Sequence, residues 1–395
     1  MNYILFDDNN YQNLLPLTYT RPVASLRCGI LTMNARWEKM LHEKCSFKTQ
    51  DYLQVKFPLT IADDNIFING SLFCNSDMIE RIQSLVQNEC LIHDQMLVAA
   101  RCAKEKAIHF SIDEVIKNFK TSKLTTDCKF LQNPWDIFSM NDWAIRFDYD
   151  LITKGRVSQP LASTNQLIGN NLFIEEGAKI SCSILNTETG PIYIGKDAEI
   201  MEGSIIRGPF AMGEHAVLKM GAKIYGATTL GDSCKVGGEV NNAVFYANSS
   251  KAHDGFVGNA VFGEWCNLGA DTNNSNLKNN YEEVKLWSVS KQSFVKTGLQ
   301  FCGLIMADHS KCGINTMFNT GTIIGVSCNI FGPGFPRNFV PSFSWGGAQG
   351  YTEYKLAKAS ETAQKVFARR NLTFDEIEQN ICKHIFEQTQ EQRKY

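Results

Sequence analysis

Residues suited to acid–base catalysis gather in two short segments of this chain. Residues 251–255 read KAHDG and residues 308–311 read DHSK. A histidine titrates at about pH 6.5, so it can act as a general base, and a neighbouring carboxylate such as Asp254 can orient its ring. Residue type alone leaves two interpretations open for His253 and for His309: a catalytic base, or a histidine without a chemical role.

Phosphate binding is suggested near the N-terminus. Arg21 and Arg27 carry positive charge that offsets a phosphate, and Asp7 and Asp8 carry the oxygen ligands that Mg²⁺ prefers. Loops that cradle nucleotide phosphates are usually rich in glycine, because a bare backbone approaches the phosphates closely. Residues 7–12, DDNNYQ, contain no glycine. Residues 7–12 therefore lack the usual pattern of such a loop.

A repeat of six residues predicts the elements that position the two histidines. Shorter sets with this spacing begin at Ile168, Phe256 and Met306. A period of six matches neither an α-helix nor a single long strand. It predicts a parallel β-helix of triangular coils stacked about 4.8 Å apart, with the aliphatic residues pointing inward. Unrelated antiparallel strands are the alternative, which a long run of hexads in phase disfavours. The longest run contains Ile194, Ile200, Ile206, Met212, Leu218, Ile224, Leu230 and Val236.

The segments that flank the repeat have other patterns. Short apolar segments alternate with helix-like ones before the repeat, which predicts an α/β domain over residues 1–155. The repeat predicts a β-helix domain over residues 156–350. Residues 351–395 are predicted to form two helices, over 353–370 and 374–392, with Thr373 as N-cap of the second helix and Glu376 as its capping-box partner.

Composition and charge exclude several classes of function. Hydrophobic residues make up 44% of the 395 residues and charged residues 20%, as in soluble globular proteins. A formal net charge of −2 without a basic block disfavours a nucleic-acid partner. No apolar run reaches the roughly 18 residues of a membrane span, and the first residues lack a signal-peptide pattern. The 13 scattered cysteines without a CxxC pair fit free thiols, so a cytoplasmic protein without membrane partners is expected.

The segment 249–280, SSKAHDGFVGNAVFGEWCNLGADTNNSNLKNN, resembles the acetyltransferase half of bifunctional GlmU-type enzymes. These enzymes share a K-A-x-H-x-x-Y-[LV]-G-[DN] run, followed by N-[IL]-G-A-G-T and a further asparagine. The stretches LLPLTYTRPVASLRCGILT, GEWCNLGADTNNSNLKNNY and DHSKCGINTMFNTGT resemble an alternative GlmU-like group from Bacteroidetes-type bacteria. The resemblance implies a left-handed β-helix, a homotrimer, and acetyl-CoA as the co-substrate that acetylates an amino-sugar 1-phosphate.

The resemblance also implies roles for particular residues. His253 matches the base that takes a proton from the substrate amine, with Asp254 beside it, and Asn267 matches an asparagine that contacts the amino-sugar. Phe256 replaces a tyrosine that touches the sugar phosphate, and Asn241 stands near a phosphate-binding lysine position. The remaining candidates for phosphate or coenzyme contacts are Lys251, Asn276, Lys311 and Asn315, and an ordinary solvated lysine is the alternative for the two lysines.

The N-terminal segment resembles the start of sugar nucleotidyltransferases, through LPLT at 15–18 and Arg21-Pro22. This resemblance implies a nucleoside triphosphate and a sugar phosphate as ligands, phosphate contacts from Arg21 and Arg27, and Mg²⁺ as a candidate ion. The sequence departs from the family at Val23, which replaces a lysine, and at Ser71, which replaces an aspartate that binds Mg²⁺.

Three functions follow from these features. The first is a GlmU-type transferase that N-acetylates an amino-sugar 1-phosphate and transfers a nucleotidyl group to a sugar 1-phosphate. The second is a nucleotidyltransferase whose β-helix serves trimerisation only. The third is a non-catalytic scaffold that binds sugar nucleotides.

Overall fold

The computed structural model describes residues 1–395, and its tertiary contacts divide the chain into two compact units. The first unit contains Met1–Leu26 and Leu31–Asn133. The second contains Arg27–Ile30 and Pro134–Tyr395. The sequence placed the boundary at residue 155, so the second unit begins earlier than predicted.

The helix α7 (Asn141–Thr153) explains this earlier boundary. The side chain of Asn141, at its start, donates a hydrogen bond of 2.8 Å to the carbonyl of Ala227 and accepts one of 3.1 Å from Thr229. Both partners lie in the repeat, so this helix packs on the β-helix instead of ending the α/β domain.

The first unit is an α/β domain, as predicted, with a mixed sheet in the order β2-β1-β3-β5-β4-β6. Strands β1, β2 and β3 are parallel, and β5 runs antiparallel to β3 and β4. Alternate residues of β1 enter two separate cores, with Tyr3 and Leu5 in one and Ile4 and Phe6 in the other, because side chains alternate along a strand. The strands are β1 Asn2–Phe6, β2 Cys45–Lys48, β3 Asp64–Asn69, β4 Glu89–His93, β5 Met96–Ala103 and β6 Lys120–Lys123.

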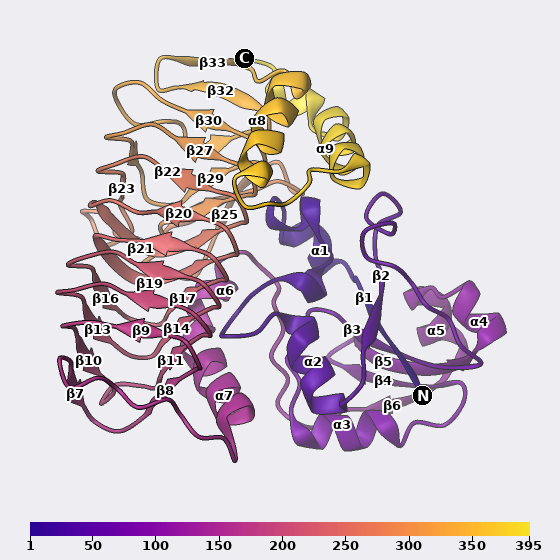
Figure 1. The fold of residues 1–395 in the computed structure, drawn as a ribbon. Coiled ribbons are helices and arrows are strands. Elements are labelled where there is room, and N and C mark those ends of the chain that lie inside the picture. The colour runs from indigo at the N-terminus through magenta and orange to yellow at the C-terminus, as the bar shows by residue number, and fades with distance from the viewer. The chain divides into compact units, whose positions relative to one another are not determined.

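Helices cover both faces of this sheet (Figure 1). Trp37 of α2 and Met78 of α3 join the core of Tyr3, whereas Ala107 of α4 and Val115 of α5 join the core of Ile4. The helices are α1 Asn10–Asn13, α2 Met33–Leu41, α3 Ser76–Gln83, α4 Lys104–Ile108 and α5 Ile112–Asn118, with short 3₁₀ turns at Leu17–Thr20 and Val23–Ser25.

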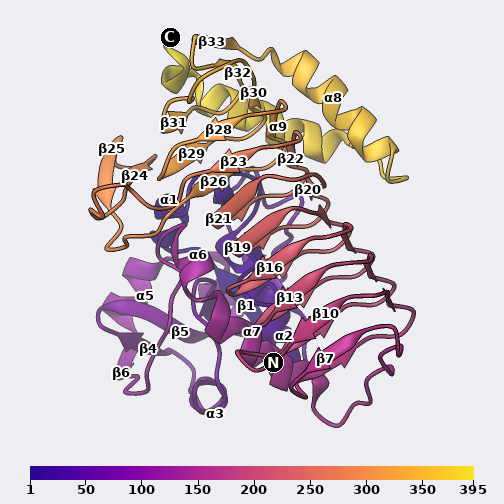
Figure 2. The ribbon, with the colours of Figure 1, turned by 90° about the vertical axis from the view of Figure 1, so that its left-hand side faces the viewer.

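The second unit begins with α6 (Asp136–Ser139) and α7, and continues as a parallel β-solenoid with three faces (Figures 1 and 2). The long strands β19 and β21 pass through a corner and contribute to two faces. The first face contains β7 Gln166–Ile168, β10 Ile184–Asn186, β13 Ile205–Arg207, β16 Lys223–Tyr225, the start of β19 Glu239–Phe245, the start of β21 Phe256–Phe262, β23 Asn273–Asn274 and β28 Met317–Phe318.

The second face includes the later residues of β19 and β21. The third face consists of strands of two to four residues. The second face contains β8 Leu172–Ile174, β11 Ile192–Ile194, β14 Phe210–Met212, β17 Thr228–Leu230, β26 Leu304–Met306, β29 Thr322–Ile324 and β31 Phe339–Val340. The third contains β9 Lys179–Ile180, β12 Glu199–Ile200, β15 Val217–Leu218, β18 Lys235–Val236, β20 Ser250–Lys251, β22 Asn267–Leu268, β27 Lys311–Cys312, β30 Asn329–Ile330, β32 Ser344–Gly347 and β33 Gly350–Glu353. A hairpin of β24 Lys285–Ser288 and β25 Ser293–Lys296 interrupts the coils.

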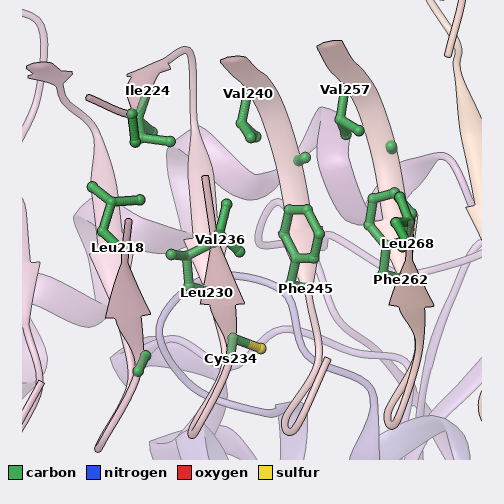
Figure 3. Packing of buried hydrophobic residues seen from close by; sticks show 14 of the residues in the cluster. Leu218, Ile224, Leu230, Cys234, Val236, Val240, Phe245, Val257, Phe262 and Leu268 are labelled. Atoms are coloured by element: carbon green, nitrogen blue, oxygen red, sulfur yellow. The ribbon is translucent and has the colours of Figure 1, made fainter. Parts of the chain in front are cut away.

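The hexad residues form the solenoid core, as predicted. All eight residues from Ile194 to Val236 in the uninterrupted run are at most 1% exposed. Figure 3 shows Leu218, Leu230 and Val236 directed into the interior. The rings of Phe245 and Phe262 stack at 4.5 Å between centroids. No single coil could bury these side chains, so the stack of coils is the source of stability.

The prediction that Phe256 faces inward was wrong, because the next residue, Val257, points into the core. Val257 is fully buried and Phe256 is only partly buried. The corner between Val257 and Phe262 contains one residue fewer than a hexad, and this shifts the inward position by one. The left-handed sense of the coil stays a prediction from the resemblance.

The C-terminal helices are α8 (Leu356–Ala368) and α9 (Glu376–Gln388). The predicted start at residue 353 was wrong, because Gly350–Glu353 pairs antiparallel with β32. The predicted cap was also wrong: Asp375, not Thr373, caps α9 by accepting a hydrogen bond of 3.0 Å from the main chain of Glu378. Phe367 of α8 stacks on Trp265 of the solenoid at 4.1 Å, which fixes the tail to the coils.

All 13 cysteines are free, and Cys182 is the one that is exposed. None of the helices combines the length and the apolar character that crossing a bilayer requires.

Candidate active site

His253 lies at an exposed corner of the solenoid, in the bend between β20 and β21. Successive coils stack at this corner through main-chain hydrogen bonds. Asp271 donates to the carbonyl of Asp254 at 3.1 Å, and Asn315 donates to the carbonyl of Ala270 at 2.8 Å. The structure therefore brings three predicted site residues, His253, Asp254 and Asn315, to one edge of the solenoid.

Lys251 points into the solenoid and supports this corner from within. It pairs with Val236 in the inward-facing ladder of the third face, and it is 1% exposed. Its Nζ donates hydrogen bonds of 2.9 Å to the carbonyl of Gly237 and 2.9 Å to the carbonyl of His253. The predicted phosphate or coenzyme contact does not fit this placement, because the ammonium group is enclosed by the coil.

The environment of Lys251 makes its charged form less favourable than it is in water. Burial lowers the pKa of Lys251 to about 8, and the carboxylates of Asp254 and Asp271 limit the fall. An ammonium group taken out of water must be hydrogen-bonded to be tolerated, and the two carbonyls supply that compensation. The main chain of His253 is thereby tied to the core of the solenoid.

Gly255 allows the chain to turn after His253. Its φ of +114° lies in the region that glycine favours, and a Cβ atom at this position would lie 2.3 Å from the carbonyl oxygen of Thr272. A side chain here would therefore push the bend away from the next coil.

Two asparagines that the motif comparison did not single out hold the strand that follows the bend. The side chain of Asn273 accepts a hydrogen bond of 2.7 Å from the main chain of Phe256. Asn274, which is 2% exposed, accepts from the main chain of Gly258 at 3.1 Å and donates to its carbonyl at 3.0 Å. Side-chain amides here replace the main-chain ladder, so the bend is fixed on both sides. The run of polar residues after Ala270 was the sequence signal for this role.

Asp254 does not orient His253 in this structure, because no hydrogen bond joins the two side chains. Both side chains are exposed at the corner. The prediction of a His–Asp pair therefore needs a rearrangement of the bend on substrate binding, and the role of Asp254 stays a prediction.

The remaining predicted contacts fall on two different faces. Asn267 and Lys311 pair along the third face and line the same pocket, of about 450 Å³. Asn241 lies on the first face, in register with Gly258. Asn276 also lies near Gly258, because a Cβ atom on that glycine would lie 2.6 Å from its Nδ2 and 2.7 Å from the Phe256 ring.

His309 belongs to a separate aromatic cluster. Its ring packs parallel to that of Trp265 at 6.5 Å and contacts Phe367 and Phe374 at 6.0 Å each. It is 8% exposed, so its place is in the packing between the solenoid and the tail, away from the bend of His253.

In the first unit, the two predicted metal ligands accept internal hydrogen bonds. Asp7 accepts from the main chain of Val23 at 2.8 Å and from Thr49 at 2.5 Å. Asp8 accepts from Asn10 and, at 2.8 Å, from Asn69. Burial raises the pKa of Asp7 to about 7 and also raises the pKa of Asp8, although these hydrogen bonds oppose both shifts.

These residues do not fit a Mg²⁺ site. Ser71, in place of the family's aspartate, is fully buried, donates a hydrogen bond of 2.7 Å to Asn69 and accepts one from Asn10. Three hydrogen bonds from Asn10 and Asn69 already use most of the acceptor capacity of the Asp8 carboxylate. No group of three or more histidine, cysteine, aspartate or glutamate side chains gathers anywhere in the structure.

The two predicted phosphate-binding arginines fall in different units. Arg21 is 6% exposed in the first unit, and its Nε donates to Thr20 at 3.4 Å. Arg27 belongs to the second unit, where it donates to the carbonyl of Ile30 and lies 3.6 Å from the carboxylate of Asp232. The guanidinium of Arg27 thus has an acidic partner within its own unit, which does not favour a phosphate contact.

The chain matches a known family in its N-terminal part. Residues 3–157 match the model of a family described as sugar nucleotidyl transferase. The matched segment extends past the first compact unit and includes α7. The class that the sequence and fold define is a sugar nucleotidyl transferase-type segment followed by a parallel β-solenoid.

Two bifunctional proteins are similar to about half of this chain. The bifunctional protein GlmU of Methanocaldococcus jannaschii is 27% identical over 231 residues, which covers 56% of this chain and 47% of the relative. The bifunctional sugar-1-phosphate nucleotidylyltransferase/acetyltransferase of Sulfurisphaera tokodaii is 29% identical over 200 residues, which covers 50% of this chain and 43% of the relative. The chain thus resembles GlmU-type proteins and spans about half the length of the curated relatives it matches.

Among solved structures, the polysialic acid-specific acetyltransferase NeuO is similar, with a TM-score of 0.29 and 10% identity over 52% of this chain and 100% of NeuO. The UDP-N-acetylglucosamine acyltransferase of Arabidopsis has a TM-score of 0.28 and 12% identity over 59% of this chain and 91% of that chain.

Proposed function

We propose that the solenoid is an acyltransferase that uses acetyl-CoA to N-acetylate an amino-sugar 1-phosphate, with His253 as the general base. The observation that carries the proposal is the mounting of His253: an exposed imidazole on a bend whose main chain is held by the buried Lys251. A catalytic base needs a fixed position within reach of its substrate, and this arrangement supplies one. Two relatives whose names include acetyltransferase or GlmU support the same class.

The reaction needs two proton transfers at His253, one to the imidazole and one from it. The nitrogen of the amino-sugar attacks the thioester carbonyl while the imidazole accepts the proton that this nitrogen loses. The carbon–sulfur bond then breaks, and the proton passes to the departing CoA thiolate. A positioned base contributes roughly 10²–10⁴-fold to such a rate. Asn267, one coil further along the third face, is the proposed contact for the amino-sugar.

A second copy of the chain completes the site in this proposal. His253 stands on an exposed edge, and an acyl-transfer site must exclude water from the thioester. The same edge exposes two apolar side chains, Met220 at 69% and Ile314 at 72%. The homotrimer that the family resemblance implies would cover this edge. Sedimentation of the purified protein at the mass of a trimer is the expected result.

The test compares two histidines on the solenoid. His253→Asn should lower kcat for CoA thiol release by about 10²–10⁴-fold, whereas His215→Asn should leave it unchanged, because His215 is exposed at another corner of the solenoid. Both variants should melt at the wild-type temperature. Turnover in His253→Asn equal to that of wild type would remove His253 from the mechanism.

For the first unit, we propose binding of a sugar nucleotide or sugar phosphate without Mg²⁺-dependent nucleotidyl transfer. The family match supports this ligand class, and the hydrogen-bonded set Asp8, Asn10, Asn69 and Ser71 is the observation against a metal site. Pyrophosphate release from UTP or dTTP with a sugar 1-phosphate and Mg²⁺ would overturn this proposal. It would support a bifunctional enzyme that transfers both an acetyl and a nucleotidyl group.

A further inference from the structure

A pocket between the solenoid and the C-terminal tail is lined by four cationic side chains and by no carboxylate. Its volume of about 450 Å³ lies in the range of small-molecule sites. Two cations, Lys235 and Lys311, come from the third face of the solenoid, and two, Arg369 and Arg370, follow α8. The other lining residues are Asn248, Ser250, Trp265, Cys266, Asn267 and Val366.

The solenoid wall of this pocket is a regular ladder. Lys235, Ser250, Asn267 and Lys311 pair in register on four successive coils. Coils are separated by about 4.8 Å, so the two lysines lie roughly 14 Å apart with two neutral hydrogen-bonding side chains between them. The ladder therefore offers positive charge at both ends and hydrogen-bonding groups in the middle.

The tail forms the opposite wall, and aromatic packing holds it in place. Phe367, two residues before Arg369, stacks on Trp265, which itself lines the pocket. Figure 1 shows α8 beside the strands of the third face. Because Trp265 and Phe367 are each 6% exposed, the end of the helix is anchored and the two arginines are presented to the pocket.

The charges in this pocket are not balanced by protein groups. Partial burial, followed by the positive charges of Arg370, Lys219 and Arg369, lowers the pKa of Lys235. Asp232, on the corner next to Asn248, already lies 3.6 Å from Arg27. Lys311 donates to the carbonyl of His309 at 2.9 Å, and burial lowers the pKa of Lys311, so a bound anion would favour its charged form. Cations held together in this way are stabilised by a bound anion.

We propose that this pocket binds the phosphate groups of a phosphorylated small molecule. Lysine and arginine side chains are the usual ligands of phosphate oxygens, and the neutral Ser250 and Asn267 suit the polar remainder of such a ligand. Ser250 lies three residues before His253 in the chain, so their Cα atoms are at most about 11 Å apart and the pocket adjoins the strand that leads to the bend. CoA and the amino-sugar phosphate are the two sources of phosphate that fit. The choice between them rests on the proposed acyl transfer, whereas the anion site itself does not.

The test measures binding without turnover. Titration calorimetry on the full chain should detect binding of inorganic pyrophosphate, CoA or glucosamine 1-phosphate. Lys235→Gln should weaken binding by about tenfold, and the double variant Arg369→Gln/Arg370→Gln by about a hundredfold. Lys223→Gln is the matched control, because Lys223 is an exposed lysine on a strand of the first face, and it should change affinity by less than about twofold.

The outcomes separate the two proposals. If the variants lose affinity for CoA, the coenzyme is the ligand of the pocket. If they lose affinity for glucosamine 1-phosphate, the sugar phosphate is the ligand. Either result supports the site. Wild-type affinity in both variants, or no binding of any of the three probes, would overturn it. Intact anion binding with no acetyl transfer to any amino-sugar phosphate would remove the proposed function and leave the pocket as a binding site.

Discussion

The Nζ atom of Lys251 lies 2.9 Å from the main-chain carbonyl oxygen of His253, although the two side chains point in opposite directions. The lysine occupies an inward position that aliphatic residues fill on neighbouring coils, and the histidine is exposed. A core position is thus used to fix the main chain of a surface residue. This relationship makes Lys251 a positioning residue for the proposed base.

Replacing Lys251 by methionine should lower kcat and leave the KM for the amino-sugar nearly unchanged. Methionine fills the core position but leaves the carbonyl of His253 without its donor, so the base is held less firmly. We expect a loss of at least about tenfold, corresponding to one hydrogen bond to a charged group. Steady-state kinetics check this, with Lys196→Met as control because Lys196 is exposed on another corner. An unchanged kcat would show that the bend of His253 keeps its position without the hydrogen bond from Lys251.

The same substitution predicts a pH effect on stability. The pKa of Lys251 is lowered from 10.5 to about 8 in the folded protein. Between these values the unfolded chain binds a proton that the folded protein does not, so the free energy of unfolding rises with pH by up to about 1.4 kcal/mol per unit. Chemical denaturation between pH 8 and 10.5 should show this rise in wild type relative to Lys251→Met. Parallel curves would contradict the prediction.

Gly255→Ala should displace the bend of His253. The new Cβ would lie 2.3 Å from the carbonyl oxygen of Thr272, at a φ of +114°. Gly221 has a φ of +68° and open space around its Cβ position, so Gly221→Ala carries backbone strain alone. We expect Gly221→Ala to cost about 1–2 kcal/mol of stability without loss of activity, and Gly255→Ala to lose acetyl transfer as well. Equal behaviour of the two variants would show that crowding by Thr272 is unimportant.

Asp7→Asn should remove a pH dependence from the stability of the first unit. Burial raises the pKa of Asp7 from 3.8 to about 7. Between these values the folded protein binds a proton that the unfolded chain releases, so the stabilisation is complete below pH 3.8 and is lost as the pH rises to 7. The thermal unfolding temperature should therefore fall more steeply with rising pH in the wild type than in Asp7→Asn. Asp63→Asn, at an exposed residue, should behave as wild type.

The solenoid core could be predicted from the sequence because its spacing is a direct consequence of geometry. Each inward position from Ile194 to Val236 is six residues from the next, and every one is buried. Counting by six failed where β19 and β21 pass through a corner, since the inward residues Val257 and Phe262 are five residues apart. A shortened corner leaves no mark in the amino-acid pattern.

The sequence did not predict the direction of every candidate side chain. His253 and Asn267 are exposed, so their proposed contacts with a ligand stay predictions. Lys251 was expected to face solvent, because lysine is rarely buried, yet carbonyls at the corner accept its protons. The cationic pocket was missed because its two walls come from segments more than fifty residues apart, and the tail offered no motif that would join them.

Phe367→Ala should release the C-terminal tail from the solenoid while the coils stay folded. The Phe367 ring stacks on Trp265 at 4.1 Å and contacts Phe374 at 5.3 Å, so its removal opens the cluster that joins the tail to the coils. Removing a buried phenylalanine costs about 3–5 kcal/mol, enough to detach a two-helix tail without unfolding the stacked coils. Limited trypsin digestion should then cleave near Arg369 and leave a stable core fragment. Leu372→Ala removes an exposed side chain of the same tail and should keep wild-type resistance. If Phe367→Ala were equally resistant, other contacts of α8 and α9 would be sufficient to hold the tail, and the arginines of the pocket would not depend on this aromatic stack.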